Sequence, residues 1–210
     1  MKKFDIITEA DARVLERGTS VELARGGHVT PLARDTLRER RITVMEEGRA
    51  SAADVSLAPR ADIRSLAVGS DHSGITHRRA LVTFLRGRGL AVQEVGPDGP
   101  DPIDYFDIAV AVARSVARHE ADAGIIVDAT GVGSTIAANK IAGVRASMAT
   151  SETIARHSRE QAGANVLALG ATLVSVDEAK SIVSAWLSTP MRDPAQIRRL
   201  AKIHELERMS

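Results

Sequence analysis

Acidic and imidazole side chains follow directly after short apolar runs at two points of the sequence. Asp71 and His72 follow the run Ser65–Gly69, within the sequence Gly-Ser-Asp-His-Ser-Gly. Asp128 follows the run Ala123–Val127. A carboxylate at such a position can act as a general base, and an imidazole can move a proton or bind an anion. The pattern therefore favours proton transfer, although capping of the next helix is an equally good interpretation of Asp71.

The glycine-rich sequence after Asp128 predicts a turn that leads into a helix. Backbone amides at the start of a helix suit a phosphate or a developing oxyanion. We therefore expect Thr130, Gly131, Gly133 and Ser134 to contribute backbone donors, with the Thr130 hydroxyl beside them. The spacing lacks the lysine of a P-loop and the third glycine of a dinucleotide fingerprint. Asp128 is the best-placed carboxylate of the chain for a general base.

A third polar segment precedes another apolar run. Arg159 and Gln161 lie shortly before the run Asn165–Gly170 and can be expected to reach a polar ligand. A helix end capped by Gly163 is an equally good interpretation of this segment.

The composition excludes several other kinds of site. The 210 residues include no cysteine, which rules out disulfides, thiolate metal ligands and thiol nucleophiles. A net charge of +1 and only five aromatic residues (three Phe, one Tyr, one Trp) argue against nucleic-acid binding. Apolar runs fall well short of the roughly 20 residues of a membrane span. The N-terminus does not resemble a secretory signal, so we expect a cytoplasmic protein that does not contact a membrane.

Apolar runs alternate with helical patterns over residues 63–210. We expect strands at 65–69, 90–95, 123–127, 144–149 and 165–170, and helices at 76–88, 104–119, 134–141, 152–161, 177–187 and 195–208. This alternation predicts an α/β fold with right-handed βαβ units and a parallel sheet. Ligands of such sheets bind at the carboxyl ends of the strands, where Asp71 and Asp128 are expected.

The first 45 residues predict a separate α+β extension. Thr8 and Asp11 have the spacing of a capping box, and Thr30-Pro31 suits the first turn of a second helix. Short strands are expected at 20–24 and 42–45. Small and polar residues at 46–62 predict a linker to the main domain at 63–210.

Four segments together resemble the ribose-5-phosphate isomerase B and galactose-6-phosphate isomerase family. They are GSDHSG at 69–74, IDYFD at 103–107, GIIVDATGVGSTIAANKIAGVRA at 124–146 and SREQAGANVLALGA at 158–171. The resemblance covers roughly residues 64–205. It implies a Rossmann-like three-layer α/β/α sandwich, a homodimer or homotetramer with active sites at the subunit interface, and no metal or organic cofactor. The implied reaction interconverts aldose and ketose sugar phosphates through a cis-enediolate.

The resemblance also implies which residues bind the substrate. They are Asp71, His72, Tyr105, Asn139, Arg145, Arg159, Gln161, Asn165 and Arg199. Asp71 is expected at the sugar hydroxyls. His72 and Arg199 are expected at the phosphate, together with Arg145 or Arg159 of a neighbouring copy. Asn139 and Asn165 are expected to orient the sugar.

The sequence departs from the family at the reacting group. Asp128 stands where many members have a catalytic Cys, and Ser134 stands where others have a Glu base. Gln161 replaces the histidine that opens the sugar ring, and Thr172 replaces an arginine. We therefore expect Asp128 to be the base and Gln161 to position the substrate, which fits a sugar with no ring to open, such as a tetrose phosphate. A non-catalytic or partner subunit, and a hydrolase or lyase that uses Asp128, are the alternatives.

The N-terminal segment resembles a different protein. Its sequence ITEADARVL, continuing through GTSVELARGGHVTPLARD, is similar to the start of the ethanolamine-utilisation cobalamin adenosyltransferase of a bacterial microcompartment pathway. The metal and cobalamin residues of that enzyme lie beyond this segment, so no such activity is implied. Docking to a microcompartment protein and extension of the oligomer interface are the two expected roles.

Overall fold

The chain consists of two compact units. The computed structural model describes residues 2–47, 52–99 and 103–209. The division falls between Ser56 and Leu57, inside the segment predicted to be a linker. Part of that segment is helical, since α3 spans Ala52–Leu57.

Unit 1 is a small parallel sheet with two helices. Its strands β1 (Lys3–Ile7), β2 (Ser20–Val29) and β3 (Thr43–Glu46) pair in the order β1-β2-β3, and α1 (Glu9–Val14) and α2 (Pro31–Glu39) connect them. The strands are parallel and alternate with helices, so the extension predicted as α+β is an α/β unit. Strand β1 was not expected from the sequence.

Both predicted helix starts of unit 1 are confirmed. The Thr8 side chain accepts a hydrogen bond from the amide of Asp11, and the Asp11 carboxylate accepts one from the amide of Thr8. Thr30 caps α2 through the amide of Ala33, and Pro31 follows it. Ile7, Val21 and Leu37 are buried in the core between these helices and the sheet, together with Ala12, Leu15, Leu23, Ala33 and Ile42.

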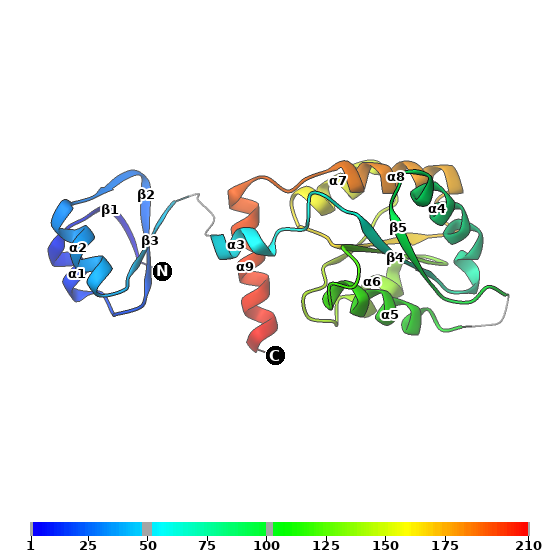
Figure 1. The fold of residues 1–210 in the computed structure, drawn as a ribbon, viewed down its shortest axis with the longest axis horizontal. Coiled ribbons are helices and arrows are strands. Elements are labelled where there is room, and N and C mark those ends of the chain that lie inside the picture. The colour runs from blue at the N-terminus through cyan, green and yellow to red at the C-terminus, as the bar shows by residue number, and fades with distance from the viewer. Residues whose placement is uncertain (1, 48–51, 100–102, 210) are drawn as a thin grey trace. The chain divides into compact units, whose positions relative to one another are not determined.

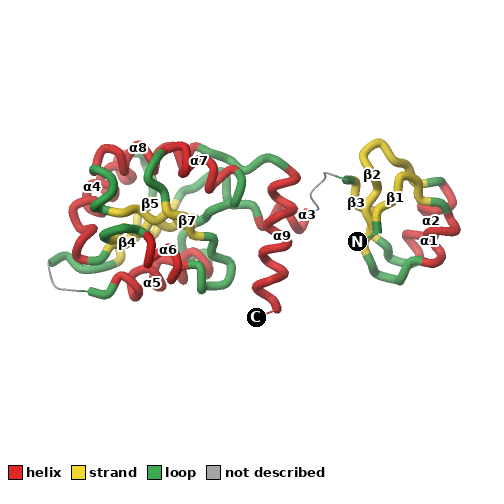
Figure 2. The backbone as a smooth tube through the Cα atoms, turned by 180° about the vertical axis from the view of Figure 1, so that it is seen from behind, coloured by secondary structure: helices red, strands yellow, loops and turns green. Residues whose placement is uncertain are grey.

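Unit 2 is a three-layer α/β/α sandwich, as predicted. It contains β4 (Ser65–Ser70), the 3-10 turn η1 (His72–Gly74), α4 (Ile75–Gly87), β5 (Ala91–Val95), α5 (Tyr105–Ala117), β6 (Ala123–Asp128), α6 (Val132–Ala138), β7 (Ala146–Met148), α7 (Glu152–Glu160), β8 (Val166–Gly170), α8 (Val176–Ser188) and α9 (Pro194–Met209). The strands form a parallel sheet in the order β5-β4-β6-β8-β7. Helices α4, α7 and α8 cover one face of the sheet, and α5 and α6 cover the other (Figures 1 and 2).

The central strands are buried on both faces because helices pack on each. Ile125 and Val127 of β6 lie in the core beneath α4 and α8, whereas Ile126 faces α5 and α6. Gly124 allows α5 to approach the sheet closely, since a Cβ at this position would lie 2.7 Å from the side chain of Val112. Because α5 follows the carboxyl end of β5 in the chain, its first turn lies at the carboxyl ends of the strands.

Two polar strand ends meet where the chain reverses its direction across the sheet. From β4 the chain moves outward to β5 and then returns to pair β6 on the other side of β4. Ser70 of β4 is the partner of Val127 of β6. Asp71 and Asp128 therefore follow at neighbouring strand ends. This carboxyl edge of the sheet is the position at which parallel α/β sheets bind ligands.

Helix α9 lies at the opposite, amino edge of the sheet. The Glu207 carboxylate accepts a hydrogen bond from the amide of Gly143, and Leu200 packs against Gly163. Both glycines lie in loops that lead into the strands β7 and β8. Among the described residues, no helix is both long enough and apolar enough to span a membrane.

Candidate functional site

The carboxylate of Asp128 is held by the turn that follows it. The residue is only 4% exposed. Its Oδ1 accepts hydrogen bonds from the amides of Thr130 (2.7 Å) and Gly131, and its Oδ2 accepts them from the amide (3.3 Å) and the hydroxyl of Ser134. A carboxylate has about four lone-pair positions, so these four donors engage both oxygens. The bond to Thr130 is an Asx turn, which Asp followed by a glycine-rich sequence can signal.

The turn that follows Asp128 differs from the predicted oxyanion site. The amides of Thr130, Gly131 and Ser134 donate to Asp128 rather than toward a ligand, and Val132 donates its amide to the Thr130 hydroxyl at 3.3 Å. The cause is the left-handed backbone of Gly131 (φ 78°), which turns the chain back over the strand end before α6 begins. Of the amides predicted to bind an oxyanion, only that of Gly133 has no acceptor among the described residues.

Asp71 caps the short turn η1, as the structural interpretation predicted. Its Oδ1 accepts hydrogen bonds from the amide (2.9 Å) and hydroxyl (2.6 Å) of Ser73 and from the amide of Gly74 (3.2 Å). Gly74 presses against the end of β6, because a Cβ there would lie 2.5 Å from the carbonyl oxygen of Val127. The turn is thereby fixed beside the neighbouring strand end. His72 is exposed on the same turn.

Tyr105 joins these residues at the carboxyl edge. Asp104 caps α5 through the amide of Phe106 (2.9 Å), which places Tyr105 in the first turn of the helix. The Tyr105 ring lies over Gly133, since a Cβ at Gly133 would come within 2.6–2.9 Å of the ring atoms and its hydroxyl. Of the predicted site residues, the structure therefore brings together Asp71, Tyr105, Asp128 and the glycine-rich turn.

Asn139 and Asn165 lie at the amino edge instead. The Asn139 amide group donates to the carbonyls of Thr135 and Ala146 (both 2.9 Å) and accepts from the amide of Ala146 (2.8 Å). The Asn165 side chain accepts from the amide of Arg145 (2.8 Å) and donates to the carbonyl of Gly143 (2.9 Å). In this chain both side chains fasten the loops before β7 and β8, away from Asp128 within one copy, and their role in orienting the sugar stays a prediction.

Arg145 and Arg159 also serve the fold at the amino edge. Arg145 donates to the carbonyls of Gly163 (2.7 Å) and Leu57 (3.2 Å). Arg159 is 2% exposed, donates to the carbonyls of Ala164 and Arg60 (both 2.7 Å), and stacks over the Trp186 ring at 4.8 Å. The predicted role of Arg159 in substrate binding thus has no support in this geometry.

The burial of these two arginines shifts their pKa values. Burial, and then the nearby charge of Arg145, lower the pKa of Arg159 to about 10. Burial also lowers the pKa of Arg145, while the charge of Glu207 acts in the opposite direction. With a pKa of about 10, the Arg159 guanidinium remains cationic near neutral pH.

Gln161 and Arg199 are exposed and lie away from the carboxyl edge. Gln161 ends α7, where its amide donates to the carbonyl of His157. Arg199 lies on α9 and donates to the side chain of Gln196 at 2.6 Å. A site that contains these residues as well as Asp71 requires a second copy of the chain.

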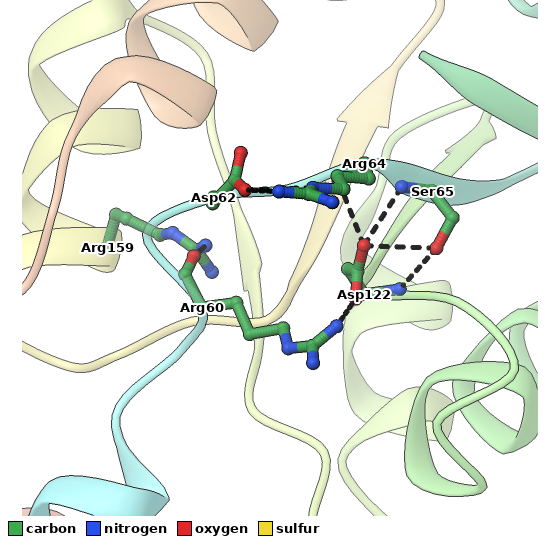
Figure 3. Close-up of polar contacts among 6 residues, drawn as sticks. All are labelled: Arg60, Asp62, Arg64, Ser65, Asp122 and Arg159. Atoms are coloured by element: carbon green, nitrogen blue, oxygen red, sulfur yellow. Dashed lines mark hydrogen bonds and ion pairs between the residues drawn. The ribbon is translucent and has the colours of Figure 1, made fainter.

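A polar cluster around Asp122 was missed by the sequence analysis. The Asp122 carboxylate accepts hydrogen bonds from the amides of Arg64 and Ser65 (both 2.9 Å), from the Ser65 hydroxyl (3.1 Å) and from the Arg60 guanidinium (Figure 3). Burial acts to raise the pKa of Asp122, but these hydrogen bonds outweigh it and lower the pKa to about 2. The donors are roughly 60 residues away in sequence, so no local pattern indicates them.

The amino edge also contains a pocket of about 370 Å³. Arg145 and Glu207 line it together with Ile203 and Leu206 of α9. This pocket does not include Asp71, Asp128 or Tyr105. Among the described residues there is no group of three His, Asp or Glu side chains arranged to hold a metal ion.

Unit 2 is similar in sequence to known proteins. The family model described as Ribose/Galactose Isomerase matches residues 66–203. Ribose-5-phosphate isomerase B of Escherichia coli is 37% identical over 69% of this chain and 97% of its own length. D-erythrulose-4-phosphate isomerase of Pectobacterium atrosepticum is 32% identical over 66% of this chain and 92% of its own length.

Solved structures agree with these sequence matches. Ribose-5-phosphate isomerase B of Clostridium thermocellum has a TM-score of 0.67 and 40% identity, covering 69% of this chain and 98% of its own. The enzyme of Mycoplasma genitalium with bound ribulose-5-phosphate has a TM-score of 0.67 and 34% identity, covering 70% of this chain and 97% of its own. The family match begins after unit 1 and spans nearly the whole of unit 2. The chain therefore belongs to the ribose/galactose isomerase family.

Proposed function

We propose that the chain is an aldose–ketose isomerase that acts on a sugar phosphate at the carboxyl edge of its sheet. The observation that carries this proposal is the pairing of β4 with β6, which sets Asp71 and Asp128 at neighbouring strand ends. Family membership and the packing of Tyr105 on Gly133 at the same edge support it. The proposed sequence of events is removal of the proton beside the carbonyl, formation of a cis-enediolate and return of the proton to the neighbouring carbon.

The turn after Asp128 constrains which group takes that proton. The sequence predicts that Asp128 does so in place of the family's Cys. Because four donors engage its two oxygens, Asp128 can accept a proton only if Ser134 or a turn amide first releases one of them. In Asp71 the three donors all bind Oδ1, so Oδ2 can accept a proton without the release of a donor.

The substrate proposed is a sugar phosphate of four or five carbons. Relatives are named for ribose 5-phosphate and for D-erythrulose 4-phosphate, and both are about one third identical to this chain. The exposed His72 is suited to the phosphate, because a protonated imidazole forms charge-assisted hydrogen bonds with phosphate oxygens. The test is to assay the purified full chain with four-, five- and six-carbon aldose and ketose phosphates and to identify the products.

The outcomes of this assay separate the alternatives. Conversion of an aldose phosphate into the ketose, or the reverse, supports the proposal. Thermal stabilisation by a sugar phosphate without turnover favours a non-catalytic or partner subunit. Cleavage or hydrolysis products favour different chemistry on the same scaffold.

We further propose a homodimer or homotetramer in which one copy completes the site of another. In support, Gln161 and Arg199 lie away from Asp71 within one copy, and Phe106, Val132 and Ile136 expose apolar side chains on α5 and α6. The test combines light scattering with complementation. Asp71→Asn and Arg199→Ala are each expected to be inactive alone, and mixing them is expected to restore about a quarter of the sites. Full activity of a monomer contradicts this proposal.

Unit 1 is proposed to be an assembly module. It has its own buried core, and the relatives match unit 2 over almost their entire length. Docking to a bacterial microcompartment protein and extension of the oligomer interface remain the two candidate roles. A chain that starts at residue 57 is expected to keep isomerase activity. A smaller oligomer for this truncated chain favours the interface role, and an unchanged oligomer favours docking.

A further inference from the structure

We propose that Asp71, and not Asp128, takes the substrate proton, and that Asp128 is a positioning residue for the glycine-rich turn. This inference rests on the proposed isomerase function. It assigns different roles to two carboxylates that end neighbouring strands of the sheet. The difference lies in where their hydrogen-bond donors attach.

Asp128 has no open carboxylate oxygen. Its Oδ1 accepts from the amides of Thr130 and Gly131, and its Oδ2 accepts from the amide and hydroxyl of Ser134. All four donors belong to the turn and the start of α6, so the carboxylate fastens this turn to the end of β6. To free one oxygen, a buried amide or hydroxyl must lose its acceptor, which is unfavourable without a replacement.

Asp71 has one engaged and one open oxygen. The amide and hydroxyl of Ser73 and the amide of Gly74 all donate to Oδ1. No described residue donates to Oδ2. Asp71 is only 6% exposed, but its Oδ2 is not completely buried, so a ligand at the strand end can reach it. The three bonds to Oδ1 hold the carboxylate in one orientation and leave Oδ2 available to a reacting group. A base needs this combination of a fixed position and a free lone pair.

The surroundings place Asp71 at the proposed site. Ser70 pairs with Val127, so Asp71 lies at the strand end next to that of Asp128. Gly74 packs on the carbonyl of Val127 and fixes the turn η1 in this position. The Gly133 amide, which has no acceptor among the described residues, is available at the same edge to an oxyanion.

The proton transfer balances with Asp71 alone. Oδ2 takes the proton from C2 of the aldose phosphate. The C–H electron pair then forms the C1–C2 double bond, and the carbonyl π pair moves to O1 as the enediolate oxygen. A proton passes from the C2 hydroxyl to O1, and the O2 electron pair forms the new carbonyl at C2. The π pair of the C1–C2 double bond then takes the proton from Asp71 to form the C1–H bond, which gives the ketose phosphate and regenerates the carboxylate.

The deciding experiment uses Asp71→Asn in the full chain. Asparagine is as good an N-cap as aspartate, so its oxygen keeps the bonds to Ser73 and Gly74 and the fold is retained. Its second group is an NH2, which cannot accept a proton. We expect kcat to fall by about 1,000-fold or more with KM within about threefold, and exchange of the C2 hydrogen with solvent deuterium to cease.

Asp128→Asn tests the positioning role. Asparagine supplies one acceptor where four donors now point, so the turn loosens. We expect a lower melting temperature and a KM raised by about tenfold, while solvent exchange at C2 continues. Asp122→Asn is the matched control, because Asp122 also accepts from four donors but lies at the amino edge. It is expected to lower the melting temperature and to leave kcat and KM unchanged.

The results separate this inference from the proposed function. Loss of exchange in Asp71→Asn, with exchange retained in Asp128→Asn, supports the inference. Exchange retained in Asp71→Asn overturns it, whether or not Asp128→Asn folds. Loss of exchange in a folded Asp128→Asn with KM unchanged also overturns it, because Asp128 is then the base. Absence of turnover and of exchange in the unaltered chain, with all sugar phosphates tested, overturns the proposed function itself.

Discussion

The two edges of the sheet in unit 2 use similar polar residues for different purposes. At the amino edge, the donors to Asp122 come from Arg60, Arg64 and Ser65, far away in sequence, and one of them is a cation. At the carboxyl edge, the donors to Asp128 are uncharged and lie within six residues of it. At the amino edge, hydrogen bonds connect residues that are distant in sequence. At the carboxyl edge, hydrogen bonds between near neighbours determine the shape of the turn after β6.

The two edges also differ in whether their polar groups have hydrogen-bond partners. At the amino edge, four side chains donate to backbone carbonyls, namely those of Asn139, Arg145, Arg159 and Asn165. At the carboxyl edge, Oδ2 of Asp71 and the amide of Gly133 have no partner among the described residues. The lesson is that a polar side chain near a predicted site can belong to the fold, and that its engaged atoms decide which role it has.

The largest expected effect on stability is that of Arg159→Ala. The change leaves the buried carbonyl of Ala164 and the part-buried carbonyl of Arg60 without this donor, and it removes the stacking on Trp186. We therefore expect a loss of about 3–5 kcal/mol of unfolding free energy. Urea denaturation followed by the fluorescence of Trp186, the only tryptophan, reports on unit 2. Arg156→Ala, on the exposed side of the same helix, is the control, with an expected change below about 0.5 kcal/mol. If both variants lose equally little unfolding free energy, the structural role assigned to Arg159 at the amino edge is wrong.

Asn139→Ala is expected to have the next largest effect. It removes three hydrogen bonds, two of which join the end of α6 to Ala146 at the start of β7, and we expect this to cost about 2 kcal/mol. The same urea titration measures this loss. If Asn139→Ala lowers turnover without any loss of stability, then Asn139 serves a ligand and the amino edge is not purely structural.

The pH dependence of stability sharpens the role of Asp122. Its pKa is lowered to about 2 in the folded chain, against about 3.9 for an unfolded aspartate. The stabilisation is therefore complete above about pH 4 and is lost as the pH falls toward 2. Urea titrations between pH 5 and 2 are expected to show this loss in the unaltered chain and a shallower one in Asp122→Asn. Identical slopes for the two proteins contradict the assignment.

His72→Ala is expected to change stability least. The side chain is exposed at the carboxyl edge, so unfolding free energy is expected to stay within about 0.5 kcal/mol. Loss of a charge-assisted bond to phosphate is expected to lower kcat/KM by about 10- to 100-fold. The test compares the unaltered chain with His72→Ala on the phosphorylated and on the free sugar. We expect the two proteins to differ in kcat/KM only on the phosphorylated sugar.

Local patterns explain how much could be predicted from the sequence. The capping box at Thr8 and Asp11 is complete within four residues and is confirmed, as are the alternating elements of unit 2. Strand β1 lacks a clear alternation, because Ile6 is exposed and only Ile7 is fully buried. The cluster at Asp122 depends on folding to bring residues 60–65 beside it, so its donors cannot be recognised before the topology is known.

The placement of residues at the carboxyl edge could be predicted in part. The positions of Asp71 and Asp128 after apolar runs indicate this edge, whereas Tyr105 was inferred only from the family resemblance. Which oxygen of each carboxylate is engaged depends on turn geometry, and the left-handed Gly131 determines it at Asp128. The arginines were assigned from resemblance, and only the structure shows Arg159 inside the molecule.

The clamped segment that leads into β4 has a mechanical consequence. Arg145 donates a hydrogen bond to the carbonyl of Leu57, and Arg159 donates one to the carbonyl of Arg60. The Asp122 carboxylate accepts hydrogen bonds from the amides of Arg64 and Ser65. A force that pulls on the chain before residue 57 therefore acts first on these hydrogen bonds at the amino edge of the sheet. The reacting edge lies at the other end of the strands, so we expect immobilisation through the N-terminal side to leave the geometry of this edge unchanged.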